Sequence, residues 1–397
     1  MITRRITTFA FIFAIVALAI GLSSCERVQT MMPDPEMPPM EEETPPMTTD
    51  GITIGVALGL TGANAEPYGI PMQEGLELAR EEINMTLPPG VGINFITEDA
   101  LSTVEGAKAA VQTLVDQGVP AIVGIGISTH LKEAFPIAND AGVVAFSPIS
   151  SATGLSSLGD YIFRTGLTVG VLNSNGTMVT HPKLEYKKVA LIYDEADEYS
   201  ESSNDAFKKT LEELGVEILT VETFQTHDTD FSTQLMNIKG MEPDTLFVSA
   251  LAAEMTQIIT QARDKDTGLP DSVRLVVPDL TVKEIQEVRD DAEGIITFSG
   301  WFSMTDTPGN AAFVEKYKAK HGVEPGPWSA QAYATLHILA KAIMTAESPD
   351  AMGIRDALAQ TMDLPTILGN FSFDPDGEAV YDPIVFVVKD GELQLFE

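Results

Sequence analysis

A turn rich in glycine and serine could hold a small anion. The stretch AIVGIGISTHLKEAF (121–135) passes from an apolar, strand-like run through Gly124 and Gly126 to Ser128 and Thr129, where a helical pattern begins. Backbone N–H groups, a hydroxyl and the positive end of a helix dipole can together bind an anion there. The third glycine of a dinucleotide-binding turn is missing, and so is the Gly-Lys-Ser/Thr of a phosphate-binding loop. The turn therefore predicts a site for a carboxylate or a phosphate, with plain helix capping as the alternative.

A second serine-rich turn follows the next apolar run. The stretch VVAFSPISSATGL (143–155) again leads from a strand-like run into small polar residues, among them Ser151. The carboxyl ends of neighbouring parallel strands meet at one edge of a sheet, and ligands bind in the crevice there. We therefore expect Ser128 and Ser151 to converge on one anion; the alternative is a serine-rich surface turn.

A single carboxylate could provide the opposite charge. The stretch VVPDLT (276–281) places Asp279 at the end of another strand-like run, just before a helical pattern. Across a cleft from the two serines, Asp279 would bind a cationic group, whereas by itself it would be read as a helix cap. Three aromatic residues could form walls of such a cleft or simply pack in the core: Tyr68, Trp301 and Trp328.

No arrangement typical of catalysis is visible. The five histidines are scattered without the spacing of a metal site. The single cysteine, Cys25, lies near the N-terminus, and neither a Gly-x-Ser-x-Gly turn nor a recognisable carboxylate pair occurs. We therefore predict a protein that is not an enzyme and that uses no metal and no cofactor.

The composition indicates an acidic globular protein. With 397 residues, 44% of them hydrophobic, the chain is long enough for two domains with substantial cores. The 58 Asp and Glu residues against 24 Lys and Arg give a formal charge of -34. Nucleic acid is excluded as a partner, because phosphate binding needs basic surface. The acidity favours solubility or docking against a basic partner surface.

The first fifty residues are predicted to stand apart from the fold. Residues 1–24 combine Arg4 and Arg5 with an apolar run, as in a signal peptide, and the run is short for a membrane span. It ends in LSSC, which resembles the lipobox of bacterial lipoproteins and implies acylation of Cys25; an ordinary secretory signal is the alternative. Two acyl chains are enough for stable membrane anchoring. Residues 25–50, rich in Pro, Met and Glu, predict an extended tether.

Residues 51–397 alternate between strand-like and helical patterns. Ile52–Leu58 is an apolar, β-branched run, and residues 70–85 follow with one apolar helical face. This alternation, continued to about residue 298, predicts an α/β fold of two lobes with parallel central sheets, and later segments that revisit both lobes through a hinge. The expected lobes are 51–168 plus 299–366, and 169–298 plus 367–397.

Eight segments stand out for their order and spacing along the chain. They are IGVALGLTG (54–62), GLELAREEIN (75–84), the strand and turn at 123–128, AGVVAFSPISS (141–151), YIFRT (161–165), DTDFSTQLMNIKGMEPDTLFVS (228–249), AEGIITFSGWF (292–302) and FSFDPDG (371–377). Together they resemble the type I periplasmic binding proteins of the branched-chain amino-acid (Leu/Ile/Val) group, which deliver ligands to ABC transporters. The resemblance covers nearly all of residues 51–397 and implies two Rossmann-like lobes, joined by three hinge crossings, that close on a ligand.

The resemblance also implies roles for single residues. Ser128, Thr129 and Ser151, with the backbone of Ile149, would bind an α-carboxylate, and Asp279, where the family often has Glu, would bind the ammonium group. Tyr68 and Trp301 fall at or near wall positions. Leu251 occupies a turn where amino-acid-binding members usually carry an aromatic residue, so amides, urea and aromatic acids remain alternative ligands.

The expected protein is a monomer, lipid-anchored in a bacterial cell envelope and facing the periplasm or the exterior. It would capture a small carboxylate, expected to be an amino acid of the branched-chain type, and present it to an ABC transporter permease. Two alternatives belong to other classes of protein: a ligand-sensing module coupled to a receptor, and an exported α/β enzyme.

Overall fold

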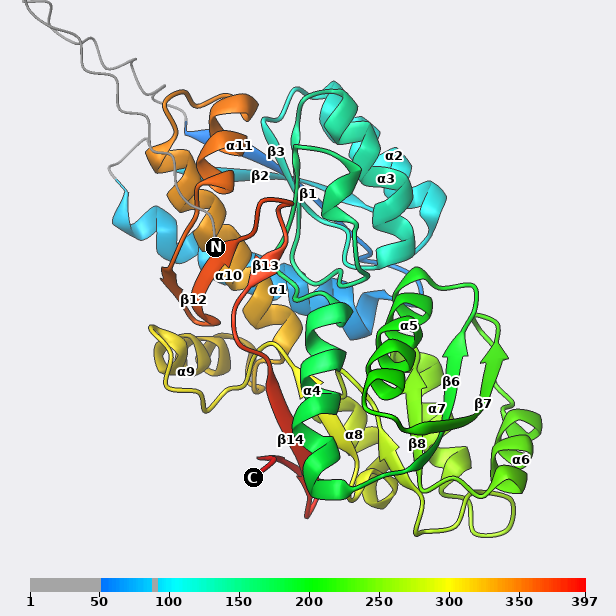
Figure 1. The fold of residues 1–397 in the computed structure, drawn as a ribbon. Helices are drawn as coiled ribbons and strands as arrows, with labels where there is room; N and C mark the ends of the chain where they lie inside the picture. The colour runs from blue at the N-terminus through cyan, green and yellow to red at the C-terminus, as the bar shows by residue number, and fades with distance from the viewer. Residues whose placement is uncertain (1–50, 88–91) are drawn as a thin grey trace, which may run out of the picture. The chain divides into compact units, whose positions relative to one another are not determined.

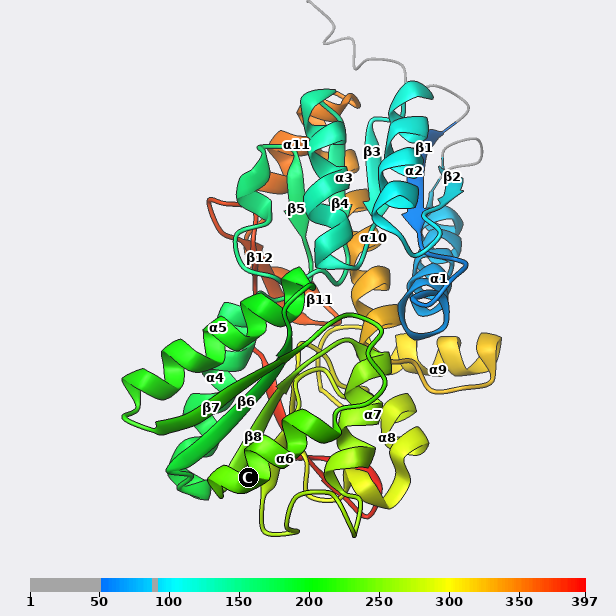
Figure 2. The ribbon, with the colours of Figure 1, turned by 90° about the vertical axis from the view of Figure 1, so that its right-hand side faces the viewer.

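The structure is a computed structural model that describes residues 51–87 and 92–397. The predicted signal peptide, Cys25 and the tether lie outside the described residues. Within them, the chain builds two lobes, each around its own sheet (Figures 1 and 2). In this part of the chain, no helix combines the length and the apolar character needed to cross a membrane.

The first lobe is built on five parallel strands in the order β2-β1-β3-β4-β5. Helices α2 and α3 pack together, and α1 packs along α10 (Figure 1). The strands are β1 (Ile52–Leu58), β2 (Ile93–Asp99), β3 (Ala121–Gly124), β4 (Val144–Ser147) and β5 (Ile162–Arg164), and the helices are α1 (Ile70–Thr86), α2 (Val104–Asp116), α3 (Ser128–Asp140), α9 (Asn310–His321), α10 (Pro327–Thr345) and α11 (Ala351–Ala359).

The second lobe contains a seven-stranded sheet in the order β15-β14-β10-β9-β8-β6-β7, parallel except for β14 and β15. Helices α4 and α5 contact each other, as do α6, α7 and α8 in sequence. The strands are β6 (Lys188–Asp194), β7 (Glu217–Phe224), β8 (Thr245–Ser249), β9 (Arg274–Val276), β10 (Ile296–Ser299), β14 (Ile384–Lys389) and β15 (Glu392–Leu395), and the helices are α4 (Val169–Leu184), α5 (Glu198–Glu213), α6 (Ser232–Met241), α7 (Ala252–Ala262) and α8 (Val282–Val288).

The predicted α/β fold with parallel central sheets is confirmed. Strands β3, β4 and β8 are buried along their whole length, because helices cover both faces of each sheet. Gly124, at the end of β3, has a φ of +139°, and a Cβ there would lie 1.9 Å from the Ala57 carbonyl oxygen. Only glycine lets the two strands approach this closely at the point where the chain turns toward α3.

The chain passes between the lobes at residues 165–168, 300–309 and 381–383. The expected return to the second lobe at residue 367 is wrong. Strands β11 (Leu364–Thr366), β12 (Gly369–Phe373) and β13 (Ala379–Val380) form a small antiparallel sheet of their own. Phe373 of this sheet packs against Phe146 and Phe163 of the first lobe, at ring-centroid distances of 5.7 and 5.1 Å. Burial of these rings keeps the segment on the first lobe until β14.

Candidate ligand-binding site

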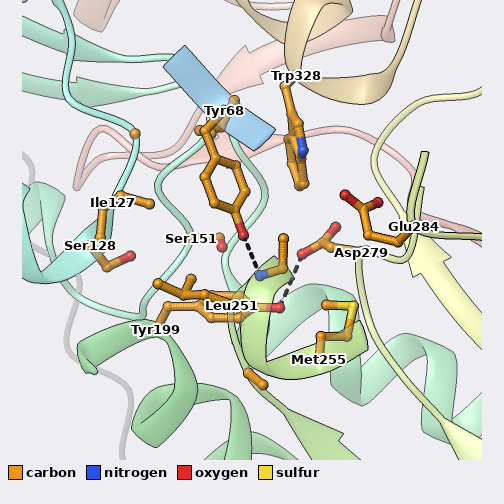
Figure 3. A pocket seen from close by; sticks show the side chains of 14 residues that line it. Tyr68, Ile127, Ser128, Ser151, Tyr199, Leu251, Met255, Asp279, Glu284 and Trp328 are labelled. Carbon is orange, nitrogen blue, oxygen red and sulfur yellow. Dashed lines mark hydrogen bonds between the residues drawn. The ribbon is translucent and has the colours of Figure 1, made fainter. Parts of the chain in front are cut away.

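A pocket of about 480 Å³, which includes its part open to solvent, lies between the lobes. Most of its residues follow the carboxyl ends of β1, β3 and β4 in the first sheet and of β6, β8 and β9 in the second, as expected for parallel sheets. The pocket brings together six predicted site residues: Ile149, and Tyr68, Ser128, Ser151, Leu251 and Asp279, which Figure 3 labels.

The serine end of the pocket is formed by the start of α3. Ser128 is the first residue of the helix, and Ile127 before it provides no side-chain cap. The Ser128 hydroxyl lies 3.2 Å from the Ser150 hydroxyl and accepts a hydrogen bond of 3.2 Å from the Ala152 N–H. The N–H of Leu131 donates to the Ile127 carbonyl at 2.9 Å, which is the first hydrogen bond within the helix. The N–H groups of the residues before Leu131 therefore have no acceptor within the helix. Ser128 therefore does not cap its helix, and its hydroxyl and the neighbouring N–H groups suit an anion.

A fully buried arginine fixes the turn that carries Ser151. The Arg164 guanidinium donates to the carbonyl oxygens of Ser150 at 3.2 Å and of Ala152 at 2.6 Å, one on each side of Ser151. It also forms an ion pair with Glu378. Burial lowers the pKa of Arg164, and the Glu378 carboxylate opposes that shift. The position of Ser151 thus depends on an ion pair that reaches the loop between β12 and β13.

Asp279 forms the opposite end of the pocket. It adopts the left-handed conformation, with a φ of +56°, and its N–H donates to the Phe298 carbonyl at 3.0 Å. The Tyr199 hydroxyl donates to the Asp279 carboxylate at 3.3 Å (Figure 3). Burial raises the pKa of Asp279 to about 7, although the hydrogen bond from Tyr199 lowers it in part. No Lys, Arg or His lines the pocket, so the protein itself provides no cation here for Asp279.

Two aromatic side chains cover the pocket from the first lobe. The rings of Tyr68 and Trp328 are tilted by 53°, with centroids 5.8 Å apart (Figure 3). The Tyr68 hydroxyl crosses the cleft and accepts a hydrogen bond of 2.8 Å from the Ala252 N–H at the start of α7. Burial raises the pKa of Tyr68 well above its ordinary value, so the phenol stays neutral. Tyr68 is therefore both a wall and a contact between the lobes.

Two of the predicted site residues lie elsewhere. Trp301 is 4% exposed and packs in the core, and its indole N–H donates to Asn310 at 2.8 Å. Thr129 does not line the pocket: its hydroxyl donates to Asp197 at 2.8 Å and accepts from the Glu198 N–H at 2.9 Å. The two side chains therefore have structural roles, Trp301 within the core and Thr129 between the lobes.

Two polar residues of the pocket, Tyr199 and Glu284, were not predicted from the sequence. Tyr199 lies in the first turn of α5, two residues after the Asp197 cap, and Glu284 lies in the first turn of α8. Each follows a strand of the second parallel sheet, which is the same signal that identified Ser128. For Trp328 the sequence allowed either a pocket wall or core packing, and the structure places it in the pocket wall.

Among residues 51–87 and 92–397, no group of three or more His, Cys, Asp or Glu side chains could hold a metal ion. Serine hydroxyls and N–H groups at one end suit an anion, and the Asp279 carboxylate at the other suits a cation.

A family model described as periplasmic binding protein matches residues 51–392. The chain belongs to the periplasmic binding protein family. It is 29% identical over 341 residues to the leucine-, isoleucine-, valine-, threonine- and alanine-binding protein of Pseudomonas aeruginosa, a match that covers 84% of this chain and 88% of that one. The predicted resemblance to the branched-chain amino-acid group of type I periplasmic binding proteins is thereby confirmed.

Solved structures show the same two-lobed fold. The substrate-binding protein LivJ of a branched-chain amino acid transporter from Streptococcus pneumoniae, in complex with isoleucine, is 30% identical to this periplasmic binding protein with a TM-score of 0.79. That match covers 87% of this chain and 98% of LivJ. A solute-binding protein of R. palustris in complex with benzoate is 20% identical to this chain, with a TM-score of 0.78. That match covers 87% of this chain and 95% of the R. palustris chain.

Replacement of Ser128 by alanine tests the serine end. We expect Ser128→Ala to weaken binding of a carboxylate ligand at least tenfold, because a hydrogen bond to a charged group contributes about 1.5–3 kcal/mol. Isothermal titration calorimetry measures the affinity. Ser150→Ala is the matched control, since it removes the same serine–serine contact but leaves the pocket hydroxyl in place. Equal losses in the two variants would contradict a direct role for Ser128.

The raised pKa of Asp279 predicts pH-dependent binding. An ammonium group pairs with the ionised carboxylate, so below pH 7 the affinity should fall about tenfold per pH unit. Titrations between pH 5 and 8, where a simple amino acid does not itself titrate, measure the effect. A flat profile would contradict it.

The stability of the ligand-free protein depends on pH in the opposite direction. Because the pKa of Asp279 is raised in the folded protein, its contribution to stability is present below about pH 4 and is lost as the pH rises to about 7.

Proposed function

We propose that this protein is the extracytoplasmic solute-binding component of an ABC transporter, and that it captures an amino acid between its lobes. The α-carboxylate binds at Ser128, Ser151 and the backbone near Ile149, and the α-ammonium group binds at Asp279. Tyr68, Leu251 and Trp328 surround the rest of the ligand. The α-amino acids of the branched-chain type are the first candidates.

The opposed polarity of the pocket carries this proposal. Hydroxyl and N–H donors lie at one end and an uncompensated carboxylate lies at the other, so a zwitterion satisfies both ends at once. Three or four charge-assisted hydrogen bonds of about 1.5–3 kcal/mol each suffice for micromolar affinity, which is about -8 kcal/mol. A simple anion would leave Asp279 without a partner, and burial of an unpaired ionised carboxylate is costly.

The relatives favour the same class of ligand. The Pseudomonas aeruginosa relative is named for five small amino acids, and LivJ was solved with isoleucine. The benzoate complex of the R. palustris protein shows that the fold also accommodates an aromatic acid. Against an aromatic acid here stands Asp279, for which such a ligand offers no cation.

A thermal-shift panel tests the proposal. The purified protein is unfolded, dialysed and refolded to remove any bound ligand, and is then heated with single amino acids, their deaminated analogues, small amides and aromatic acids. A ligand at 100 times its Kd adds about 2.7 kcal/mol of stability. We expect a shift with amino acids that is absent for the deaminated analogues. Shifts with aromatic acids or amides alone would refute amino-acid binding and would indicate that Leu251 belongs to a pocket of different specificity.

The membrane anchor is a separate part of the proposal and rests on the sequence around Cys25. Acylation of this residue would hold the protein on a bacterial membrane, facing the periplasm or the exterior. We expect Cys25→Ser to move the protein from the membrane fraction to the soluble fraction of fractionated cells, without a change in ligand affinity. Retention of the variant in the membrane fraction would contradict the anchor. Loss of amino-acid uptake on deletion of the gene would support transport over sensing.

A further inference from the structure

The end of the pocket formed by Asp279 contains a second carboxylate, to which the proposed function assigns no role. Glu284 lies in the first turn of α8 and is only 4% exposed, yet it lines the same pocket as Asp279 (Figure 3). An α-amino acid with an aliphatic side chain brings one ammonium group to these two acids. One carboxylate would therefore stay buried without a cation, which is unfavourable.

Helix capping accounts for only one oxygen of Glu284. The N–H of Thr281 donates to Oε2 at 3.0 Å, and the Thr281 hydroxyl donates to the same oxygen. Among the residues that the structure describes, both hydrogen bonds of the Glu284 carboxylate go to Oε2, and the side chain lines the pocket. A capping box is satisfied by Gln as well as by Glu. Capping therefore fixes the orientation of the side chain but does not require its negative charge.

The described residues that line the pocket provide no positive charge that would neutralise Glu284. None of the residues that line the pocket is Lys, Arg or His. The adjacent Lys283 is directed to Glu66 instead, 3.0 Å from its carbonyl oxygen and 3.9 Å from its carboxylate. The compensating cation must therefore come from the ligand.

The neighbouring walls suit a cationic side chain. Trp328 and Tyr68 line the pocket together with Glu284, and aromatic rings attract cations electrostatically. Leu251 and Met255 add apolar surface, which can pack against the methylene groups of a short side chain. A carboxylate, aromatic rings and apolar surface thus line the same pocket.

We propose that the ligand is an α-amino acid with a second cationic group on a short side chain, and that Glu284 binds this group. The inference rests on the proposed function, since it needs the α-carboxylate and α-ammonium of the ligand to be held at Ser128 and Asp279. It assigns Glu284 as the residue that sets side-chain specificity.

A pair of isosteric amino acids tests the proposal. Norvaline and 2,4-diaminobutyrate have the same number of side-chain heavy atoms and differ only in a terminal methyl or ammonium group. We expect calorimetry to show that 2,4-diaminobutyrate binds at least tenfold more tightly than norvaline. In Glu284→Gln, which keeps the capping box, this ratio should fall at least tenfold while the affinity for norvaline changes less than about threefold. Glu287→Gln is the matched control, because it removes the same charge from an exposed position of the same helix.

The outcomes separate this inference from the proposed function. Tighter binding of norvaline, or a preference that is unchanged in Glu284→Gln, would overturn the role of Glu284 and leave amino-acid binding intact. Failure of both amino acids, together with a shift by an aromatic acid in the thermal panel, would overturn both proposals. The comparison of the two ligands in the wild-type protein decides the question even if a variant does not fold.

Discussion

Asp279→Asn is expected to weaken binding of the amino-acid ligand about 100-fold, or about 2.7 kcal/mol. The loss of one partner from a buried, hydrogen-bonded charge pair costs about 2–5 kcal/mol, and here the ammonium group would lose its carboxylate. Asparagine is the appropriate replacement, since the φ of +56° at this position is tolerated by Asn but strained for most residues. Its side-chain oxygen can still accept the hydrogen bond from Tyr199. Calorimetry at pH 8, where Asp279 of the wild type is ionised, measures the loss.

The ligand itself provides the control for this variant. The deaminated analogue lacks the ammonium group, so its affinity should not fall in Asp279→Asn. The variant should also lose the pH dependence between pH 5 and 8, because the titrating carboxyl is gone. An equal loss for the amino acid and its deaminated analogue would indicate damage to the fold rather than a lost charge pair.

Arg164→Met is expected to lower the free energy of unfolding by about 3–5 kcal/mol, the cost of leaving a buried charge without its partner. The arginine is fully buried and Glu378, its ion-pair partner, is 12% exposed. The variant also leaves the Ser150 and Ala152 carbonyls and the Ser156 hydroxyl without the donor that they now have. Denaturant unfolding followed by circular dichroism measures the loss.

A double variant distinguishes the buried charge from the packing around it. Arg164→Met combined with Glu378→Leu removes both charges, and we expect it to be more stable than Arg164→Met alone. The affinity for the ligand should stay low in both variants, because neither holds the carbonyl groups that flank Ser151. A single variant within 1 kcal/mol of the wild type would contradict the structural role of Arg164.

Much of the fold followed from local patterns. Apolar runs bounded by glycine, as in Ile52–Leu58, alternate with amphipathic helical segments, and burial on both faces makes such runs parallel strands. The convergence of Ser128, Ser151 and Asp279 was predictable for the same reason, since residues that follow parallel strands gather at one edge. The short strands β12 and β13 were assigned to the wrong lobe, because a strand pattern does not tell which of two sheets the strand will join.

The aromatic residues show where local reasoning ends. Trp301 and Trp328 are equally apolar in the sequence, yet Trp301 packs in the core and Trp328 lines the pocket. Tyr199 and Glu284 follow strands as Ser128 does, but only the tertiary structure shows that α5 and α8 begin at the edge where the second sheet faces the first lobe, which brings both side chains to the pocket.

By itself, the sequence determined the α/β class, the parallel sheets and the serine and aspartate ends of the site. These depend on periodicity and on turns, which are properties of neighbouring residues. Only the tertiary structure decided which side chains line the pocket between those ends. Contacts such as Tyr68 with Ala252 and Arg164 with Glu378 join segments far apart in the chain. Each polar group can be buried only because the other segment provides its hydrogen-bond or ion-pair partner.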